Sequence, residues 1–335
     1  MNQPKSPDIL CRDFRLPGVY PDCAINLRNK SSTHRNDPSK TVLFIHGATY
    51  GSTSTFDYPT DGQSWMDSMA NAHYDAWCLD LSGYGISDRP ELMSQSPESH
   101  PPLMTTDQAV TEVKIAVDFI LTDRGIQQVS LIGYSWGSAI CGQYAGQWPS
   151  TVDRLVLCGA LWVNPNPKAS AHPLGAYRLV TADEAYDRWI QTLDTEVLDQ
   201  IIDADYARKW CADVVRCDPD FDPDHHPHLR APRGVQADYL RCAVTGKDWY
   251  TPEKIQAPTL VVMGDLDIET TPEQGWQVFK RLEGAATRQY SVLGLGTHSM
   301  LLERNRFELF DVCDHFLNQS YSSSASEHTA CPAEG

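Results

Sequence analysis

The chain has 335 residues, of which 41% are hydrophobic, enough for one large core or for a core with an inserted subdomain. Its formal net charge of −17 argues against a nucleic-acid partner, because the phosphate backbone repels an acidic surface. The sequence has neither an apolar run of the roughly 20 residues that span a bilayer nor the basic and then apolar start of a signal peptide, which argues against a membrane partner.

Short apolar runs alternate with segments of helical periodicity along most of the chain. Two short runs at 9–16 and 23–29 predict an antiparallel hairpin at one edge of a sheet. Five continuous apolar runs then predict parallel strands covered on both faces, at 41–47, 74–81, 128–134, 154–160 and 258–265. Helical spacing is found at 62–72, 106–125, 136–148 and 272–284. This order predicts the α/β class, with a mostly parallel central sheet flanked by helices.

The cysteines are expected to be mostly free thiols. Ten cysteines would suit a disulfide scaffold in a short secreted chain, but this chain is neither short nor visibly secreted. Cys78 and Cys158 lie inside predicted strands, where a thiol packs as a small hydrophobic group. We therefore expect a cytoplasmic protein.

The alternation of strands and helices breaks between about residues 163 and 250. This stretch has several helical runs, a proline-rich piece and no strand-like apolar run. A helical insertion after a strand typically covers the carboxyl edge of the sheet, where ligands bind. We therefore expect a core formed by 1–162 and 251–318, a helical cap over 163–250, and a disordered polar tail over 319–335.

One short stretch has the pattern of a nucleophile. Gly133-Tyr134-Ser135-Trp136-Gly137 fits the G-x-S-x-G elbow and lies between a buried strand and a helix of small residues, as that motif requires. The turn is strained, so the residues two before and two after the serine must be small. The amino terminus of the helix also favours negative charge developing nearby. We therefore predict that Ser135 is a catalytic nucleophile.

A serine at neutral pH needs a base, and the base needs a group that orients it. The expected order is serine, acid and histidine, each just beyond a strand. His298 follows a short strand and a glycine-rich loop, and we predict that it is the base. Asp265 and Asp267 compete for the role of the acid. Asp267 is preferred because it lies farther past the end of the strand.

An oxyanion hole is expected where the first parallel strand ends, at His46-Gly47. We predict that the backbone N–H groups of Ala48 and Trp136 are the donors, each worth roughly 3 kcal/mol of barrier. Thr49 is the alternative to Ala48. His46 is expected to brace the loop by hydrogen bonding.

The substrate pocket is the least determined part of the site. The aromatic residues in and near the cap could line an apolar pocket, although aromatics at helical spacing are more often plain core. They are Trp162, Tyr186, Trp189, Trp210 and Trp249. The residues predicted to contact substrate are Thr49, Tyr50, Trp162, Trp210 and Met300.

The stretch 218–228 contains His225, His226 and His228 among carboxylates and could pass for a metal site. The side chains that bind one metal ion must point toward it, and the three prolines in this segment hold its side chains apart. We interpret it as a solvated loop of the cap and expect neither a metal nor a cofactor.

These residues resemble the α/β-hydrolase superfamily, and the resemblance runs over about residues 20–318. It rests on the elbow, on HG at 46–47, on THSM at 297–300, and on DLSGYGISDRP at 80–90, which resembles that superfamily's D-x-x-G-x-G-x-S loop. The resemblance implies an α/β-hydrolase fold with an inserted helical cap. It also implies a structural role at the mouth of the site for Asp80, Gly83, Gly85 and Ser87.

Within the superfamily the resemblance points to esterases. SWGS is similar to prolyl aminopeptidases, but their glycine- and proline-rich oxyanion loop is absent. Haloalkane dehalogenases and epoxide hydrolases use an aspartate nucleophile, so the serine argues against both. HGATYG, DGQSWM and RAPRGVQADYL together most resemble a bacterial esterase group that includes serine-dependent macrolide esterases. This resemblance implies a macrocyclic lactone as substrate and a role in antibiotic resistance.

The leading hypothesis is therefore a serine carboxylic-ester hydrolase that acts on a small-molecule ester or lactone through an acyl-enzyme, ring-opened for a lactone. A macrolide with a protonated amino sugar also suits an acidic surface. The alternatives within the fold are a general carboxylesterase, an amidase or aminopeptidase, an acyltransferase and a carbon–carbon bond hydrolase. From a different class, the alternative is a ligand-binding protein with an unused elbow.

Overall fold

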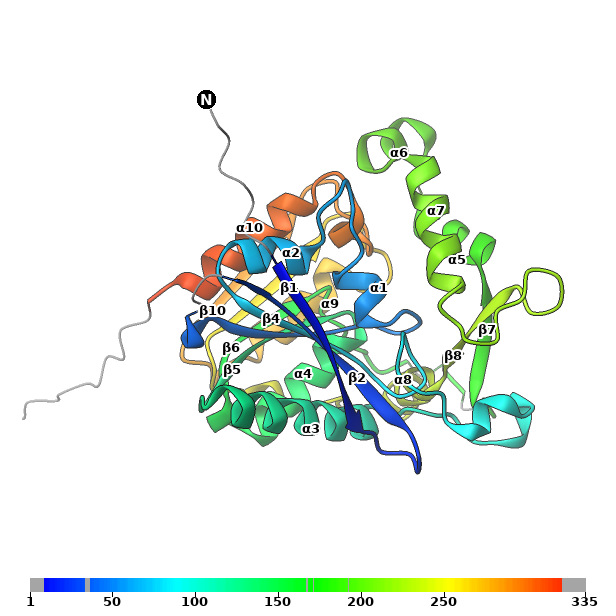
Figure 1. Cartoon of the computed structure of the whole chain (residues 1–335), viewed down its shortest axis with the longest axis horizontal. Coiled ribbons are helices and arrows are strands. Elements are labelled where there is room, and N and C mark those ends of the chain that lie inside the picture. The colour runs from blue at the N-terminus through cyan, green and yellow to red at the C-terminus, as the bar shows by residue number, and fades with distance from the viewer. Residues whose placement is uncertain (1–8, 34–36, 167, 171, 192, 321–335) are drawn as a thin grey trace, which may run out of the picture.

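A central sheet of eight strands organises the chain, whose computed structural model describes residues 9–33, 37–166, 168–170, 172–191 and 193–320 (Figure 1). The strand order is β1-β2-β4-β3-β5-β6-β9-β10. The first two strands run antiparallel, as the predicted hairpin requires, and the other six run parallel to one another. The strands are β1 (Ile9–Pro17), β2 (Ala24–Ser32), β3 (Thr41–Ile45), β4 (Asp75–Asp80), β5 (Val129–Tyr134), β6 (Val152–Cys158), β9 (Thr259–Gly264) and β10 (Arg288–Leu293).

Both faces of this sheet are apolar, which explains the continuous hydrophobic runs. Successive residues of a strand point to opposite faces. In β3, Val42 and Phe44 pack into one buried cluster, and Leu43 and Ile45 pack into the other. The helices that cover the two faces are α1 (Ser52–Phe56), α2 (Trp65–Asn71), α3 (Thr106–Arg124), α4 (Trp136–Gln147), α9 (Pro272–Lys280) and α10 (Arg306–Asn318). The predicted α/β class, with a mostly parallel central sheet flanked by helices, is confirmed.

Most elements of the segment 163–250 lie at the right of Figure 1, whereas its last helix lies nearer the middle and packs against the core. The segment holds β7 (Tyr177–Thr181), α5 (Ala182–Ile190), α6 (Thr195–Ile201), α7 (Ala204–Val215), β8 (His228–Pro232) and α8 (Gly234–Thr245). We call this segment the cap. Its aromatic residues Tyr186, Trp189 and Trp210 pack into the same buried cluster as one face of the main sheet. The cap is therefore anchored to the core by hydrophobic contacts.

The expectation that the cap has no strands is wrong. β7 and β8 pair antiparallel, with Tyr177 opposite Pro232 and Thr181 opposite His228. Each strand has only five residues and carries an arginine, Arg178 in β7 and Arg230 in β8. So short a run with a charge inside it has no clear hydrophobic pattern, and its pairing partner lies far away in the sequence.

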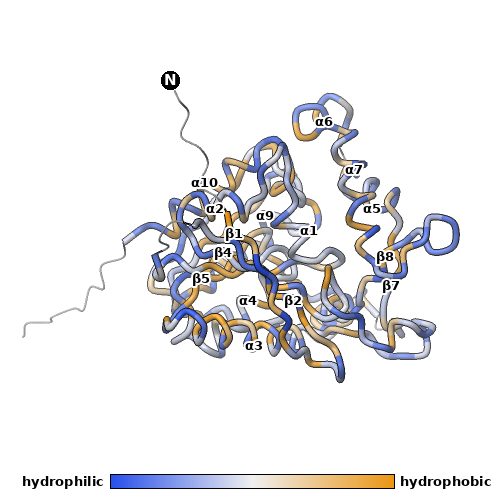
Figure 2. Tube along the Cα trace, in the orientation of Figure 1, coloured by the Kyte–Doolittle hydropathy of each residue, from blue (hydrophilic) through white to orange (hydrophobic). Residues whose placement is uncertain are grey.

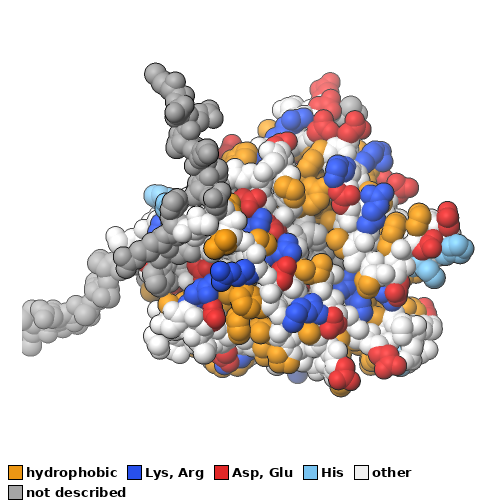
Figure 3. Space-filling view, in the orientation of Figure 1, with side chains coloured by type: hydrophobic (Ala, Val, Ile, Leu, Met, Phe, Trp, Pro, Cys, Tyr) orange, Lys and Arg blue, Asp and Glu red, His pale blue; other side chains and the backbone are white. Residues whose placement is uncertain are grey.

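The loop between α7 and β8 is rich in aspartate and histidine. It is largely blue at the outer edge of Figure 2, whereas orange segments are prominent in the core. In Figure 3, histidine and acidic side chains gather at its tip. Of the tail predicted over 319–335, residues 321–335 lie outside the described part of the chain.

Two further sequence expectations concern cysteines and membranes. Cys78 in β4 and Cys158 in β6 are completely buried, as predicted, and the nine cysteines in the described part of the chain are all free thiols. In the same part of the chain, every helix is too short or too polar to cross a bilayer.

Candidate active site

The elbow at Ser135 has a backbone that only its small neighbours allow. Ser135 has φ 54° and ψ −119°, a strained combination for a residue with a side chain. A Cβ at Gly133 would lie 2.2 Å from the carbonyl oxygen of Gly137, and a Cβ at Gly137 would lie 2.1 Å from that of Ile45. Both glycines are therefore needed for β5 to turn into α4, which presents Ser135 at the carboxyl edge of the sheet.

The structure brings Ser135, His298 and Asp267 together from three separate strand ends. The Oγ of Ser135 lies 2.9 Å from Nε2 of His298, and Nδ1 of His298 lies 2.9 Å from Oδ2 of Asp267. The hydroxyl of Tyr134 donates a hydrogen bond to the backbone carbonyl of His298 at 2.5 Å. This bond ties the histidine loop to the elbow, and the sequence analysis did not foresee it.

Asp267 and Asp265 occupy different environments. Asp267 is 2% exposed, and its carboxylate accepts hydrogen bonds from the backbone N–H groups of Glu269 and Thr270 and from the Thr270 hydroxyl. Asp265 is exposed and accepts a hydrogen bond from the backbone N–H of Gly296. The structure therefore places Asp267, and not Asp265, beside the imidazole.

The charge state of His298 depends on its carboxylate neighbours. Burial lowers the pKa of His298, but Asp267 and Glu269 stabilise the imidazolium and raise its pKa above the usual 6.5 overall. Glu269 lies 3.7 Å from Nε2 of His298, and it is a group that the sequence analysis missed. Burial opposes ionisation of Asp267, but the nearby His298 and several hydrogen bonds lower its pKa overall.

The loop after β3 lies against the elbow. A Cβ at Gly47 would lie 2.9 Å from Cβ of Ser135, so this loop passes directly beside the serine. His46 is completely buried, and its Nε2 accepts a hydrogen bond from the backbone N–H of Leu81 while its Nδ1 contacts the carbonyl of Gly47. His46 therefore braces the loop, as expected.

Both predicted oxyanion donors line the same space as Ser135. Trp136 is the first residue of α4, so its N–H has no carbonyl one turn earlier in the helix to bond. Ala48 and Trp136 both line the cavity in front of Ser135. Thr49, the alternative, has φ 90°, and its hydroxyl accepts hydrogen bonds from Arg178 and Arg188 of the cap.

Two cavities meet at Ser135. The main cavity, of about 520 Å³, lies between the core and the cap, and the small cavity, of about 40 Å³, also contains His298. Of the predicted substrate contacts, Thr49 lines the main cavity, and Tyr50 and Trp210 line the small one.

Trp162 and Met300 line neither cavity, so the structure does not support their prediction as substrate contacts. Trp162 packs edge-on against Tyr250 and beneath the guanidinium of Arg281, because the chain turns into the core after β6. Met300 is completely buried in a short helical turn, in the cluster beneath one face of the sheet. Each is a large apolar group that fills the core.

Charged groups of the main cavity were missed by the sequence analysis. Arg178, Arg188, Arg233 and Glu269 all contribute to its lining. Three of the four come from the cap, and their positions depend on the β7–β8 pairing that the sequence did not reveal. An arginine in a short polar run carries no signal of its own, so these residues could not have been found by pattern.

The D-x-x-G-x-G-x-S loop has the structural role that the resemblance implied. The carboxylate of Asp80 accepts hydrogen bonds from the backbone and hydroxyl of Thr53 and from the backbone of Ile86. Gly85 has φ 49°, and a Cβ there would lie 2.2 Å from Asp80. The Ser87 hydroxyl donates to the Asp80 carbonyl at 2.5 Å. The loop is therefore closed around one buried carboxylate.

The histidine-rich loop of the cap is held by a buried ion pair. Arg230 donates three hydrogen bonds to the carboxylate of Asp218, one from its backbone and two from its guanidinium. His225 contacts Asp222 at 3.2 Å at the exposed tip. Within the described residues, no group of three or more histidine, cysteine or carboxylate side chains could hold a metal ion.

Comparisons with known proteins agree with this architecture. A family model for the alpha/beta hydrolase fold matches residues 40–185. Epoxide hydrolase 1 of Caenorhabditis elegans is 25% identical over 125 residues, 37% of this chain, and Epoxide hydrolase 3 of Mus musculus is 24% identical over 153 residues, 45% of this chain. The matched segments span only 26% and 35% of the length of these two relatives.

A solved structure extends the likeness to nearly the whole fold. The serine hydrolase involved in carbazole degradation (CarC enzyme) superposes with a TM-score of 0.61 at 16% identity, covering 92% of this chain and 99% of the other. At that identity the likeness concerns the fold. The sheet order, the elbow and the family model together show that this chain has the α/β-hydrolase fold.

Proposed function

We propose that this chain is a serine hydrolase of carboxylic esters, including lactones. The observation that carries the proposal is the hydrogen-bonded series from Ser135 through His298 to Asp267, which opens onto a cavity of about 520 Å³. A serine hydroxyl in this arrangement can lose its proton to the imidazole as it attacks a carbonyl.

The proposed reaction has two halves. Ser135 attacks the ester carbonyl, His298 takes the hydroxyl proton, and the N–H groups of Ala48 and Trp136 stabilise the oxyanion. His298 then gives the proton to the leaving alcohol, which in a lactone stays attached to the acyl group. His298 next activates a water molecule, which releases the acid and restores Ser135. Asp267 orients the imidazole and stabilises its charged form.

Epoxide opening is not favoured by this site, although two curated relatives are named epoxide hydrolases. The resemblance given above implies an aspartate nucleophile for that group. In this chain a serine occupies the elbow, with its hydroxyl 2.9 Å from the base.

The charges of the main cavity do not favour a macrolide with a protonated amino sugar. The overall acidity suggested attraction of a protonated amino sugar, but the main cavity is lined by three arginines and one glutamate. Charges at the binding surface act at shorter range than the overall charge and are less screened by salt. The hypothesis that the substrate is a macrolide therefore depends on the loose sequence resemblance alone. We propose the broader class of esters and lactones as substrates.

The test is covalent trapping combined with one substitution. A serine-directed fluorophosphonate should label Ser135, and Ser135→Ala should abolish both labelling and turnover of para-nitrophenyl esters while the chain stays folded. Mass spectrometry locates the adduct, and amide analogues of the same esters test the amidase alternative. A folded protein with neither an adduct nor turnover would support the ligand-binding alternative.

A further inference from the structure

Three guanidinium groups face the main cavity beside Ser135. Arg178 belongs to β7, Arg188 to α5, and Arg233 follows directly after β8, so all three are contributed by the cap. Glu269 is the single carboxylate side chain among the described residues that line this cavity. The lining therefore carries more positive than negative charge, in a protein whose net charge is −17.

The three arginines differ in their partners. Arg188 forms a two-pronged ion pair with Glu269, with Nε 2.8 Å from one carboxylate oxygen and Nη2 on the other. Arg178 donates to the hydroxyl of Thr49 at 2.5 Å, and Arg233 donates to the side-chain amide oxygen of Gln236 at 2.6 Å. In the described part of the chain, neither Arg178 nor Arg233 forms an ion pair with a carboxylate.

Arg178 and Arg233 are partly exposed, and an anion between them would supply the negative charge that neither has in an ion pair. Burial lowers the pKa of Arg178, and the positive charges of Arg188 and Arg233 lower it further. Charged groups removed from water are normally paired, because neutral hydrogen-bond partners replace only part of their hydration. A carboxylate between Arg178 and Arg233 would compensate both charges, and a guanidinium binds a carboxylate through two parallel hydrogen bonds.

The position of this cluster relates it to the reacting ester. The Thr49 hydroxyl that Arg178 contacts belongs to the residue next to Ala48, the proposed oxyanion donor. An anionic group held by Arg178 would therefore lie only a few atoms from an ester carbonyl at Ser135. We propose that the substrate is an ester or lactone that carries a carboxylate, and that Arg178 and Arg233 bind this carboxylate. This inference rests on the proposed function.

The first test compares para-nitrophenyl esters of matched length that differ in terminal charge. They are the half ester of adipic acid, the neutral hexanoate, and the trimethylammonio-pentanoate, with spontaneous hydrolysis subtracted. We expect kcat/KM for the anionic ester to exceed that for the neutral ester by about tenfold or more, the value of one charged hydrogen bond. The cationic ester should be the poorest, and added salt should reduce the preference.

A second pair of esters places the carboxylate on the other side of the scissile bond. Comparing para-carboxyphenyl butanoate with phenyl butanoate shows whether the anion belongs to the acyl or to the alcohol part. A preference for the charged ester in either pair supports the proposal. The proposal fails if the neutral or cationic ester is preferred in the first pair and the neutral ester in the second.

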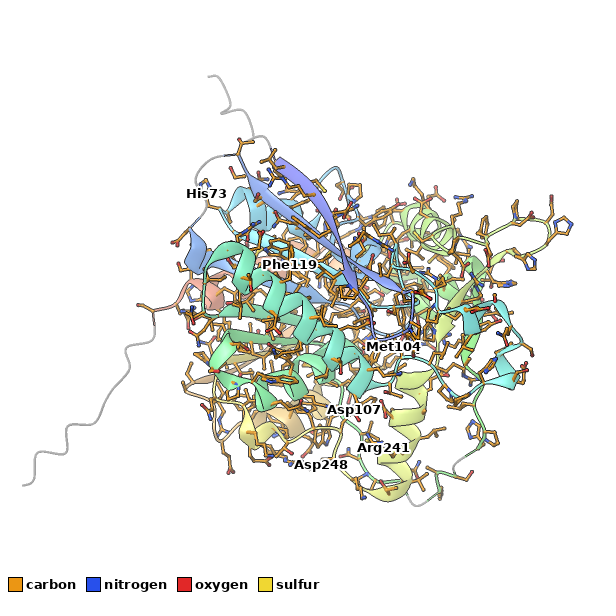
Figure 4. All side chains as sticks on the ribbon, turned by 60° about the horizontal axis from the view of Figure 1, so that its bottom comes forward. His73, Met104, Asp107, Phe119, Arg241 and Asp248 are labelled. Carbon is orange, nitrogen blue, oxygen red and sulfur yellow. The ribbon has the colours of Figure 1, made fainter. Side chains whose placement is uncertain are left out.

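The variants Arg233→Gln and Arg178→Gln test the assignment to particular residues. Each should lower the ratio of kcat/KM for the anionic ester to that for the neutral ester about tenfold, since each removes one charged donor. Arg241→Gln is the matched control, because Arg241 also belongs to the cap, on α8, but lines a different cavity with Asp107 (Figure 4). This control should leave the ratio unchanged.

The use of a ratio separates binding of the anion from support of the fold. If Arg178→Gln and Arg233→Gln slow both esters equally, the arginines only brace the cap against the core, and the proposal is overturned. Thermal melting and fluorophosphonate labelling check each variant, and Arg178→Met, which also removes the charge, replaces Arg178→Gln if the latter does not fold. Absence of labelling and of turnover for every ester would instead contradict the proposed function itself.

Discussion

Strain and charge are concentrated on a few residues around Ser135. Ser135 adopts a positive φ that its glycine neighbours permit. His298 contacts Ser135 through Nε2 and Asp267 through Nδ1, and a second carboxylate, Glu269, lies 3.7 Å from Nε2. Asp267 is held by hydrogen bonds from Glu269 and Thr270, so its position does not depend on its contact with His298. At this scale the site is preorganised, and single substitutions should separate the roles of its members.

Replacement of the orienting acid should distinguish the two neighbouring aspartates. Asp267→Asn should lower kcat about ten thousandfold, because an amide favours the wrong imidazole tautomer and no longer stabilises the imidazolium. Asp265→Asn is the matched control and should retain most of the activity, since that side chain is exposed. Steady-state kinetics on a para-nitrophenyl ester measure both. A larger loss from Asp265→Asn would show that the assignment of the acid is wrong.

The pH profile should report the carboxylates around His298. The imidazole must be neutral to accept the serine proton, so kcat/KM should rise with pH, with an apparent pKa above 6.5. Glu269→Gln should move this limb to lower pH, because it removes one negative charge near the imidazolium and leaves Arg188 unpaired. Glu273→Gln, at an exposed position on α9, is the control. If the rise of kcat/KM with pH is unchanged in Glu269→Gln, Glu269 does not affect the pKa of His298.

Among the elements, the small β7–β8 sheet of the cap positions the charged part of the cavity. Its strands carry Arg178 and lead into Arg233, and the buried pair between Arg230 and Asp218 fixes the long loop that precedes β8. Because the two strands pair only with each other, the sheet depends on such tertiary contacts.

Breaking the buried pair should loosen the cap. Asp218→Asn should destabilise the protein by about 3 kcal/mol, because it leaves the guanidinium of Arg230 buried with less compensation. Asp220→Asn is the matched control: Asp220 also contacts Arg230, at 2.8 Å, but it is 65% exposed and should matter little. Thermal melting and hydrogen exchange over β7 and β8 provide the measurements. Equal effects of the two substitutions would contradict the role given to burial.

At the scale of the whole molecule, Glu303 connects the cap with the core. It is completely buried and accepts hydrogen bonds from Trp189 of α5 and from the backbone and hydroxyl of Thr297, next to His298. Burial raises the pKa of Glu303 from 4.5 to about 7, although these hydrogen bonds favour its charged form. The stability of the folded chain should therefore depend on pH through this group.

The sign of that dependence follows from proton binding. Between pH 4.5 and about 7, folded Glu303 keeps a proton that the unfolded chain has lost, so stability should fall as pH rises through this window. The expected change is about 3 kcal/mol for this group. Glu303→Gln should flatten the dependence, and Glu308→Gln, on the exposed face of α10, should not. Denaturant unfolding at a series of pH values measures both. An equally steep dependence in Glu303→Gln would rule Glu303 out as its source.

The sequence by itself determined the features that depend on local patterns. Continuous apolar runs identified the parallel strands, because both faces of the sheet are covered. The elbow was recognisable because its backbone requires glycine at Gly133 and Gly137, whatever the rest of the fold does. The position of His298 could also be expected, because it follows a late strand and the carboxyl ends of parallel strands meet at one edge of the sheet.

Only the tertiary structure decided which side chains share a space. It placed Asp267 rather than Asp265 beside His298. It also packed Trp162 against Tyr250 in the core, and not in the pocket that the sequence predicted it to line. It also paired β7 with β8 and so brought arginines toward a serine that lies far from them in the sequence. These outcomes depend on packing between distant segments, and a lone arginine or tryptophan has no sequence periodicity that encodes its neighbours.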